Sequence, residues 1–243
     1  MLAYSGGIDS AILGALVHER KMKVSSLTMG RKGSSDLVAA SERSQSRLQE
    51  NSIVSSLGSS EIEMAAKKVS KLVKVSNLSH FEDCMAFWLI SEKASELKNV
   101  EYILSANGPD EVFCGYDRFR RILDSDGYVS VEAEIPRALK IAEDLGAQVR
   151  KITSHFGLQI CEPFLDQRYI RSALEIPVQL KILPGNDLLR KRIWRCFGRS
   201  IKVDEKIVMR PKKAMQYGMG IHSITCSMLK KGTLKLEFPN LRK

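Results

Sequence analysis

The chain has 243 residues, of which 44% are hydrophobic and 27% charged, a composition typical of a globular protein large enough to bury an α/β core. No apolar run approaches the roughly 20 residues that a membrane helix needs, which excludes a helical membrane span. The first residues lack a basic segment followed by an apolar stretch, so we expect no secretory signal and a cytoplasmic location.

The net charge of +10 is unevenly distributed. Residues 181–243 carry 16 Lys and Arg against 4 Asp and Glu, while the preceding 180 residues are slightly acidic. Such a basic segment can contact nucleic acid, attract a polyanion such as ATP into a cleft, or form a solvated helical surface. The five cysteines are scattered without a C-x-x-C pair, which argues against a disulfide framework, a zinc site or a two-cysteine sulfur carrier. The four histidines lie far apart, so we expect surface or packing roles for them.

The predicted elements alternate between strands and helices from the first residue onward. Short apolar or β-branched runs predict strands over residues 1–4, 23–29, 52–57 and 100–104. Apolar residues at helical spacing predict helices over residues 8–19, 36–50, 61–73 and 80–97. Asp36 is expected to cap the second helix, and Phe87, Trp88 and Leu89 are expected in the core.

This alternation predicts an α/β fold with a doubly wound parallel sheet, in which ligands bind beyond the carboxyl ends of the strands. After Asp126 the pattern is mostly helical, with breaks near 161–163, 184–185 and Pro211. We expect an α/β core over residues 1–125 and a helical C-terminal region over residues 126–243 packed on it, the two forming one compact domain.

The stretch SGGIDS, residues 5–10, joins the first strand to the first helix. Gly6 and Gly7 allow backbone N–H groups to approach phosphate oxygens, and the following helix offers its positive end. Ser5 and Ser10 add hydroxyls, and Asp9 adds an oxygen ligand for Mg²⁺. The loop lacks the lysine of a G-x-x-x-x-G-K-[ST] phosphate loop. A plain serine-glycine turn that caps a helix is the structural alternative.

SGGIDS resembles the S-G-G-x-D-S pyrophosphate loop of the ATP pyrophosphatase superfamily, whose members adenylate a substrate and release pyrophosphate. A second loop narrows the family. LSANGPDEVFCGYDRF, residues 104–119, resembles the L-S-G-E-G-x-D-E-V-F-G-G-Y signature of the asparagine synthetase C-terminal domain. In that resemblance Asp110 and Glu111 bring a second carboxylate to Mg²⁺-pyrophosphate, whereas the alternative is that they cap the next helix.

Three further stretches match the family in order: LTMGRKGSSD (27–36), PFLDQRYIRSAL (163–174) and RPKKAMQYGMG (210–220). The resemblance implies an adenine nucleotide α-hydrolase-like fold with ATP and Mg²⁺ as cofactors. It assigns the nucleotide to Ser5, Gly6, Gly7, Asp9, Ser10, Met29, Gly30 and Ser105, the metal ion to Asp9 and Asp110, and catalysis to Lys212, Asp110 and Glu111. A cation at Lys212 would neutralise charge on the α-phosphate.

Some positions depart from the family pattern. Asn107 replaces the glutamate of G-E-G, and an amide cannot act as a general base. Gln159 and Cys161 stand where the family has a glutamate and an arginine. The chain also begins at the pyrophosphate-loop strand, without the family's glutaminase domain, so we expect ammonia or an amine as the nitrogen donor, or a separate glutaminase subunit as partner.

The resemblance therefore predicts an amide-forming ligase that activates a carboxylate, by default aspartate, as an acyl-adenylate and then accepts ammonia or an amine. The departures keep open a catalytically silent homologue that binds ATP or a partner. The basic C-terminal segment keeps open a tRNA-modifying enzyme of the same superfamily, although the absence of paired cysteines counts against thiolation.

Overall fold

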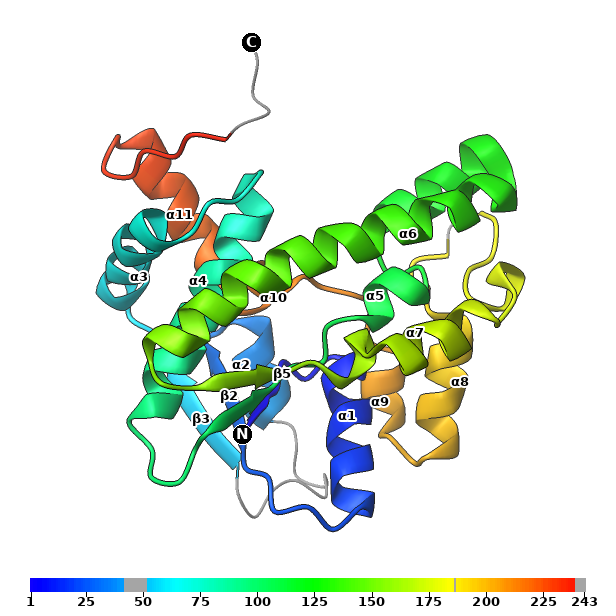
Figure 1. The fold of residues 1–243 in the computed structure, drawn as a ribbon, viewed down its shortest axis with the longest axis horizontal. Helices are drawn as coiled ribbons and strands as arrows, with labels where there is room; N and C mark the ends of the chain where they lie inside the picture. Colours follow the sequence, from blue (N-terminus) through cyan, green and yellow to red (C-terminus); the bar gives the residue numbers. More distant parts are fainter. Residues whose placement is uncertain (42–51, 186, 239–243) are drawn as a thin grey trace.

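Five parallel strands form one sheet in the computed structural model, which describes residues 1–41, 52–185 and 187–238 (Figure 1). The order across the sheet is β3-β2-β1-β4-β5. The strands are β1 (Leu2–Ala3), β2 (Ser26–Gly30), β3 (Ser52–Ser56), β4 (Tyr102–Leu104) and β5 (Gln159–Cys161). The predicted α/β class with a parallel sheet is confirmed, and β5 is a fifth strand that the sequence pattern did not reveal.

The chain reverses its direction of travel across the sheet at β1. From β1 it moves to β2 and β3 on one side, then returns to β4 and β5 on the other, so that Leu2 pairs with both Ser26 and Leu104. The loops after β1 and β4 therefore adjoin at the carboxyl edge of the sheet. A reversal of this kind opens a crevice in which open α/β sheets bind ligands.

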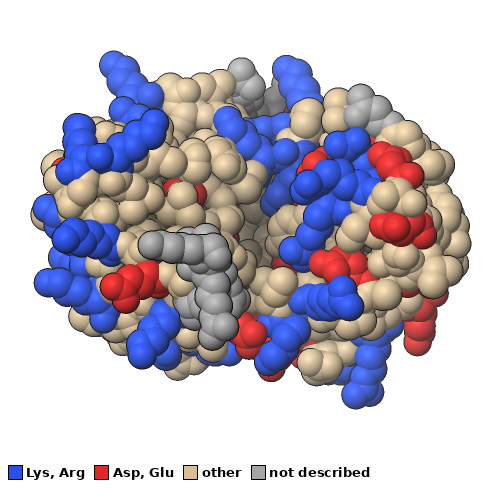
Figure 2. Space-filling model, turned by 90° about the horizontal axis from the view of Figure 1, so that it is seen from above, with Lys and Arg blue, Asp and Glu red and all other residues tan. Residues whose placement is uncertain are grey.

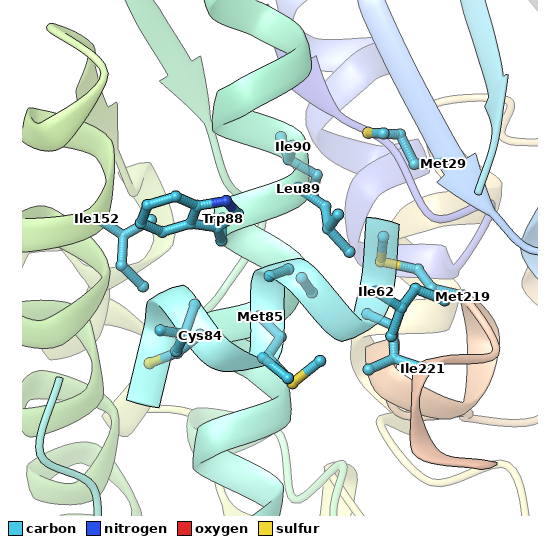
Figure 3. Close-up of a cluster of buried hydrophobic side chains, with 14 of the residues drawn as sticks. Met29, Ile62, Cys84, Met85, Trp88, Leu89, Ile90, Ile152, Met219 and Ile221 are labelled. Atoms are coloured by element: carbon cyan, nitrogen blue, oxygen red, sulfur yellow. The ribbon is translucent and has the colours of Figure 1, made fainter. Parts of the chain in front are cut away.

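Helices cover both faces of the sheet (Figure 1). On one face lie α3 (Ser59–Leu72), α4 (Leu78–Ser95) and α11 (Ile221–Lys230); Trp88 of α4 lies beside Ile152 there (Figure 3). On the other face lie α1 (Ile8–Glu19), α7 (Gln167–Leu174), α8 (Arg192–Ser200) and α9 (Glu205–Val208). The strands contribute side chains to the hydrophobic cores on both faces, since Met29 of β2 packs in the core on the α4 face and Leu2 of β1 packs in the core on the α1 face.

The second predicted helix begins as α2 (Ser35–Ser41), and its expected continuation over residues 42–50 lies outside the described residues. Asp36 lies within the first turn of α2 instead of capping it, because the helix starts one residue earlier than expected. Phe87, Trp88 and Leu89 are buried, as predicted.

A long helix, α6 (Asp117–His155), crosses the molecule above the sheet (Figure 1). It follows the short α5 (Pro109–Val112) and bends at Gly127, whose φ of 77° and ψ of −176° are not helical. The short elements η2 (Pro163–Leu165), η3 (Val178–Leu180) and α10 (Met215–Gly218) complete the described fold. Because α6 runs across residue 125, the division into two regions at that residue stays a prediction. Among the described residues, no helix is long and apolar enough to cross a membrane.

Candidate active site

A cavity opens at the carboxyl edge of the sheet, where the loops after β1 and β4 meet. Figure 2 shows a hollow between two parts of the surface, with a group of Lys and Arg side chains beside it. The cavity is lined by residues of four sequence-predicted segments, Ser5, Asp9, Ser10, Met29, Ser105, Asn107, Asp110 and Lys212 among them. The topology therefore gathers stretches that lie up to about two hundred residues apart in the chain.

The loop after β1 is closed by its own hydroxyl groups. The Gly7 N–H donates to Ser5 Oγ at 3.3 Å, and Ser10 Oγ donates to the Gly7 carbonyl at 3.1 Å. Ser5 and Ser10 Oγ lie 3.3 Å apart. These bonds hold the loop in one conformation at the start of α1, where the helix dipole favours an anion.

Asp9 and Asp110 converge on one buried ammonium group. Lys191 Nζ lies 2.5 Å from Asp9 Oδ2 and 2.7 Å from Asp110 Oδ1, and the Lys191 side chain is completely buried. Trp194 Nε1 donates to the other Asp9 oxygen at 2.9 Å. The sequence analysis missed Lys191. It lies in a run of basic residues, and its left-handed backbone, φ 52° and ψ 41°, turns the chain into α8.

Lys212 contacts Asp110 from the opposite side, with Nζ 2.5 Å from Asp110 Oδ2. Burial by itself would raise the pKa of Asp110, but the ammonium groups of Lys191 and Lys212 outweigh it and hold that pKa well below its usual range. Burial would likewise lower the pKa of Lys212, and the carboxylates of Asp110 and Asp9 raise it above its ordinary value. Both groups are therefore charged at neutral pH.

Two arginines hold the segments that carry Lys191 and Lys212 in place through hydrogen bonds to backbone carbonyl groups. Arg195 is 3% exposed and donates to the carbonyl oxygens of Leu189, Arg190, Val208 and Arg210. Arg210 donates to the Gly6 carbonyl at 3.0 Å and lies 3.5 Å from buried Asp36. Burial raises the pKa of Asp36 to about 6, against the opposing charge of Arg210.

A second cavity, of about 380 Å³, adjoins the first. The two share five wall residues: Phe87, Asn107, Asp110, Lys212 and Met215. Two further carboxylates, Asp83 and Glu111, line the second cavity only. Burial raises the pKa of Asp83 to about 7 and also raises the pKa of Glu111, which the charge of Asp110 raises further.

Glu111 is thus placed away from the first cavity, although it is adjacent to Asp110 in sequence. Its Oε1 accepts a 2.6 Å hydrogen bond from the Tyr116 hydroxyl, and its Oε2 is buried without a partner among the described residues. Three of the predicted nucleotide-binding glycines, Gly6, Gly7 and Gly30, do not line the first cavity either. Gly7 lines a smaller cavity together with Ser5, Asp9 and Lys212. Gly6 binds Arg210 through its carbonyl, and Gly30 ends β2 against Met219.

Two glycines of the second loop are required by close packing. Gly108 has φ 120°, and a Cβ there would collide with the carbonyl group of Phe164 in the PFLD stretch. A Cβ on Gly115 would collide with Asp110 Oδ1 and with the Lys191 stem. The position of the DEVFCGY stretch in the site therefore depends on close contacts with distant residues as well as on its local sequence.

Asn107 is held from behind by Glu162, whose Oε1 accepts from Asn107 Nδ2 at 3.0 Å. Burial raises the pKa of Glu162, and the hydrogen bond from Asn107 opposes that rise. Asn107 lines both cavities, and after this bond its amide keeps one N–H and the Oδ1 oxygen for other partners. Glu162 directly follows β5, so the position of this strand, which the sequence pattern did not predict, brings Glu162 to Asn107.

The donor set fits a hard cation bound to phosphate. Asp9 and Asp110 offer only carboxylate oxygens, the ligands that Mg²⁺ prefers. The point on which the two carboxylates converge holds the Lys191 ammonium group, and Trp194 and Lys212 contact their other two oxygens, so an ion would use the lone pairs that these contacts leave.

Ser5 and Ser10 line the first cavity with hydroxyls suited to phosphate oxygens, whereas the Ser5 and Gly7 N–H groups donate to those hydroxyls within the loop. Lys212 lies at the border of the two cavities. The first cavity, of about 90 Å³, has room for part of a nucleoside triphosphate, and the second, of about 380 Å³, has room for a small second reactant.

Comparison with known proteins agrees with the two loops. The sequence profile of the family described as asparagine synthase matches residues 2–151 and 138–236. A Methanocaldococcus jannaschii protein named for the glutamine-hydrolysing asparagine synthetases is 28% identical over 93% of this chain. Glutamine-hydrolysing asparagine synthetases of Gallus gallus and Homo sapiens are each 25% identical, over 88% and 93% of the chain. The chain covers 47%, 39% and 40% of these three relatives, less than half of each.

Proposed function

The chain belongs to the asparagine synthase family, and from this premise we propose that it is an ATP-dependent, amide-forming ligase. The observation that carries the proposal is that three distant segments bring Asp110 and Lys212 to the border between two cavities and Asp9 to the wall of the first. The nucleotide occupies the first cavity and the carboxylate substrate the second. Cytoplasmic action is part of the same proposal.

In the first step, an oxygen of the substrate carboxylate attacks the α-phosphorus of ATP, and the bond to the β-phosphate oxygen breaks. The products are an acyl-adenylate and pyrophosphate. Asp9 and Asp110 would hold Mg²⁺ beside the Lys191 ammonium group, and the ion would add neutralising charge to the pyrophosphate. Lys212 is charged and lies at the border of the cavities, so its ammonium group stabilises negative charge on the α-phosphate, a contribution of about 3 kcal/mol when such a donor is removed.

In the second step, the nitrogen of ammonia or an amine attacks the acyl carbon, the bond to AMP breaks, and the nitrogen loses a proton. The relatives are named for hydrolysis of glutamine, and this chain matches less than half of their length. We propose free ammonia, an amine, or ammonia released by a glutaminase as the nitrogen source.

Aspartate is the default substrate because of the family name. The second cavity supports an acid that also carries an amine, since Glu111 offers a carboxyl group to a cation and Lys212 and Arg118 offer positive charge to a carboxylate. Positively charged residues of the basic C-terminal region, among them Lys191 and Arg195, are buried at the site. Other Lys and Arg residues of that region, Lys206 and Lys213 among them, are exposed, so the basic charge does not by itself decide between ATP and tRNA.

The alternative of a catalytically silent homologue depends on Asn107, whose amide replaces the family's glutamate. Exchange of labelled pyrophosphate into ATP, measured with aspartate and a panel of amino acids and other carboxylates, separates the two. Exchange that requires one acid supports the ligase. Measurable ATP binding without exchange for any acid refutes the ligase in favour of the silent homologue.

Lys212→Ala sharpens this test. Loss of about 3 kcal/mol of transition-state stabilisation lowers the exchange rate by a factor on the order of 100. Lys206→Ala is the matched control, because Lys206 is an exposed lysine of the same basic region. Equal exchange rates in the two variants would show that Lys212 does not stabilise the transition state of the first step.

A further inference from the structure

A second polar cluster lies where α11 packs against α4, outside the candidate active site. His222 and Cys226 are four residues apart on α11, so their side chains share one face of that helix. Glu82 reaches them from α4, 140 residues earlier in the chain. One ligand atom from each residue, an oxygen, a nitrogen and a sulfur, lies within 4.8 Å of the other two.

Glu82 is 1% exposed and has few partners for a buried carboxylate. His222 Nδ1 lies 2.9 Å and 3.1 Å from its two oxygens, and within the described residues no other group hydrogen-bonds them. Burial raises the pKa of Glu82, and His222 only partly opposes this rise. A buried carboxylate costs free energy unless positive charge compensates it.

Cys226 completes the set. Its Sγ lies 3.5 Å from His222 Nε2 and 3.9 Å from Nδ1, and the residue is partly exposed. The Tyr217 ring lies 4.6 Å from the His222 ring and limits its movement. The three potential ligands therefore come from two helices that are fixed against each other by the core.

We propose that Glu82, His222 and Cys226 bind a Zn²⁺ ion. Sulfur, imidazole nitrogen and a carboxylate oxygen together favour zinc over Mg²⁺ or Ca²⁺, which prefer oxygen ligands. Zinc–ligand distances of about 2.0–2.3 Å place the ligand atoms of a tetrahedral site about 3.5 Å apart. The present separations reach this arrangement through side-chain shifts of about 1 Å. Water occupies the fourth position, which the partly exposed His222 leaves accessible.

The ion would act on the candidate active site through the chain that precedes α11. Met215 and Met219 line the first cavity, and Met219 accepts a hydrogen bond from the Arg31 N–H at 2.9 Å beside β2. His222 follows Met219 by three residues. Zinc at the cluster therefore fixes the wall of the nucleotide cavity to α4. It also displaces the thiol proton of Cys226 into solvent, so binding weakens as pH falls.

Metal binding to the chelator-treated, reduced full chain tests the proposal without any activity assay. Zn²⁺ should bind with a stoichiometry of one per chain and raise Tm. Co²⁺ in its place should give a thiolate-to-cobalt charge-transfer absorption. Addition of Mg²⁺ should give neither the absorption nor competition with Co²⁺.

Two variants locate the ion. Cys226→Ser should abolish the charge-transfer band, and both Cys226→Ser and His222→Ala should weaken Zn²⁺ binding at least about tenfold, since even indirect supporting groups contribute that much. Cys196→Ser is the matched control, because Cys196 is an exposed free cysteine on α8. The proposal is overturned if the wild-type cobalt complex lacks the thiolate band, or if Cys226→Ser and Cys196→Ser bind Zn²⁺ equally well.

Discussion

Replacement of Lys191 by methionine should destabilise the protein by about 3 kcal/mol. The ammonium group is completely buried between Asp9 and Asp110, at 2.5 Å and 2.7 Å. Removal of one partner of a buried ion pair costs about 3–5 kcal/mol because the remaining charge is left without compensation. We expect the lower end, because Asp110 keeps Lys212 and the Asp9 side chain is 15% exposed.

Thermal unfolding, followed by circular dichroism, measures the effect. For a chain of this size, 3 kcal/mol corresponds to a fall in Tm of about 6–12 °C. Mg²⁺ should recover part of this loss in the Lys191→Met variant, because Asp9 and Asp110 then each have one oxygen that no longer faces an ammonium group. Lys181→Met is the matched control. Lys181 is also buried, but it forms no ion pair among the described residues and donates to the Ala173 carbonyl at 2.8 Å. If Tm falls equally in both variants, the ion pairs of Lys191 with Asp9 and Asp110 add no stability beyond that of a buried lysine.

Two further predictions concern stability. The pKa of Asp83 is about 7 in the folded chain and near 3.8 in the unfolded chain, so between these pH values the folded chain holds the extra proton and wild-type stability falls as pH rises. Asp83→Asn removes this pH dependence. The free energy of unfolding of the variant minus that of the wild type, measured by urea unfolding, should therefore be a few kcal/mol larger at about pH 8 than at about pH 4.5. The same value of this difference at both pH values would contradict the prediction. Gly108→Ala should cost more than about 3 kcal/mol, since it adds a clash with Phe164 to backbone strain, whereas Gly157→Ala, which meets no atom within 4 Å, should cost about 1 kcal/mol. Similar Tm values for the two alanine variants would show that the backbone at residue 108 rearranges.

The parts of the fold that local sequence encodes were predictable. The strand-loop-helix unit at SGGIDS and the DEVFCGY loop follow from residue types at fixed spacing, and the structure brings both loops to one sheet edge. β5 escaped prediction because it has three residues, pairs only with β4, and lies in a region of helical periodicity.

Functional contacts that depend on the fold could not be predicted in this way. Lys191 looks like any residue of a basic surface run until the turn into α8 places it between two carboxylates. Glu82 lies inside an apolar helix pattern, and only the packing of α11 gives it His222 as a partner. In both cases the deciding neighbour is more than 100 residues away.

The geometry at Asn107 also bears on where the proton goes in the proposed second step. Asn107 lines both cavities and Glu162 accepts from its Nδ2; its amide can form hydrogen bonds with an incoming amine but cannot remove the proton. Asp83 lines the adjoining cavity with a pKa of about 7, a value suited to a general base at neutral pH. In the proposed ligase, the base is therefore Asp83 and not residue 107. This assignment requires Asp83→Asn to slow amide formation while pyrophosphate exchange continues; equal loss of both reactions would assign Asp83 to substrate binding instead.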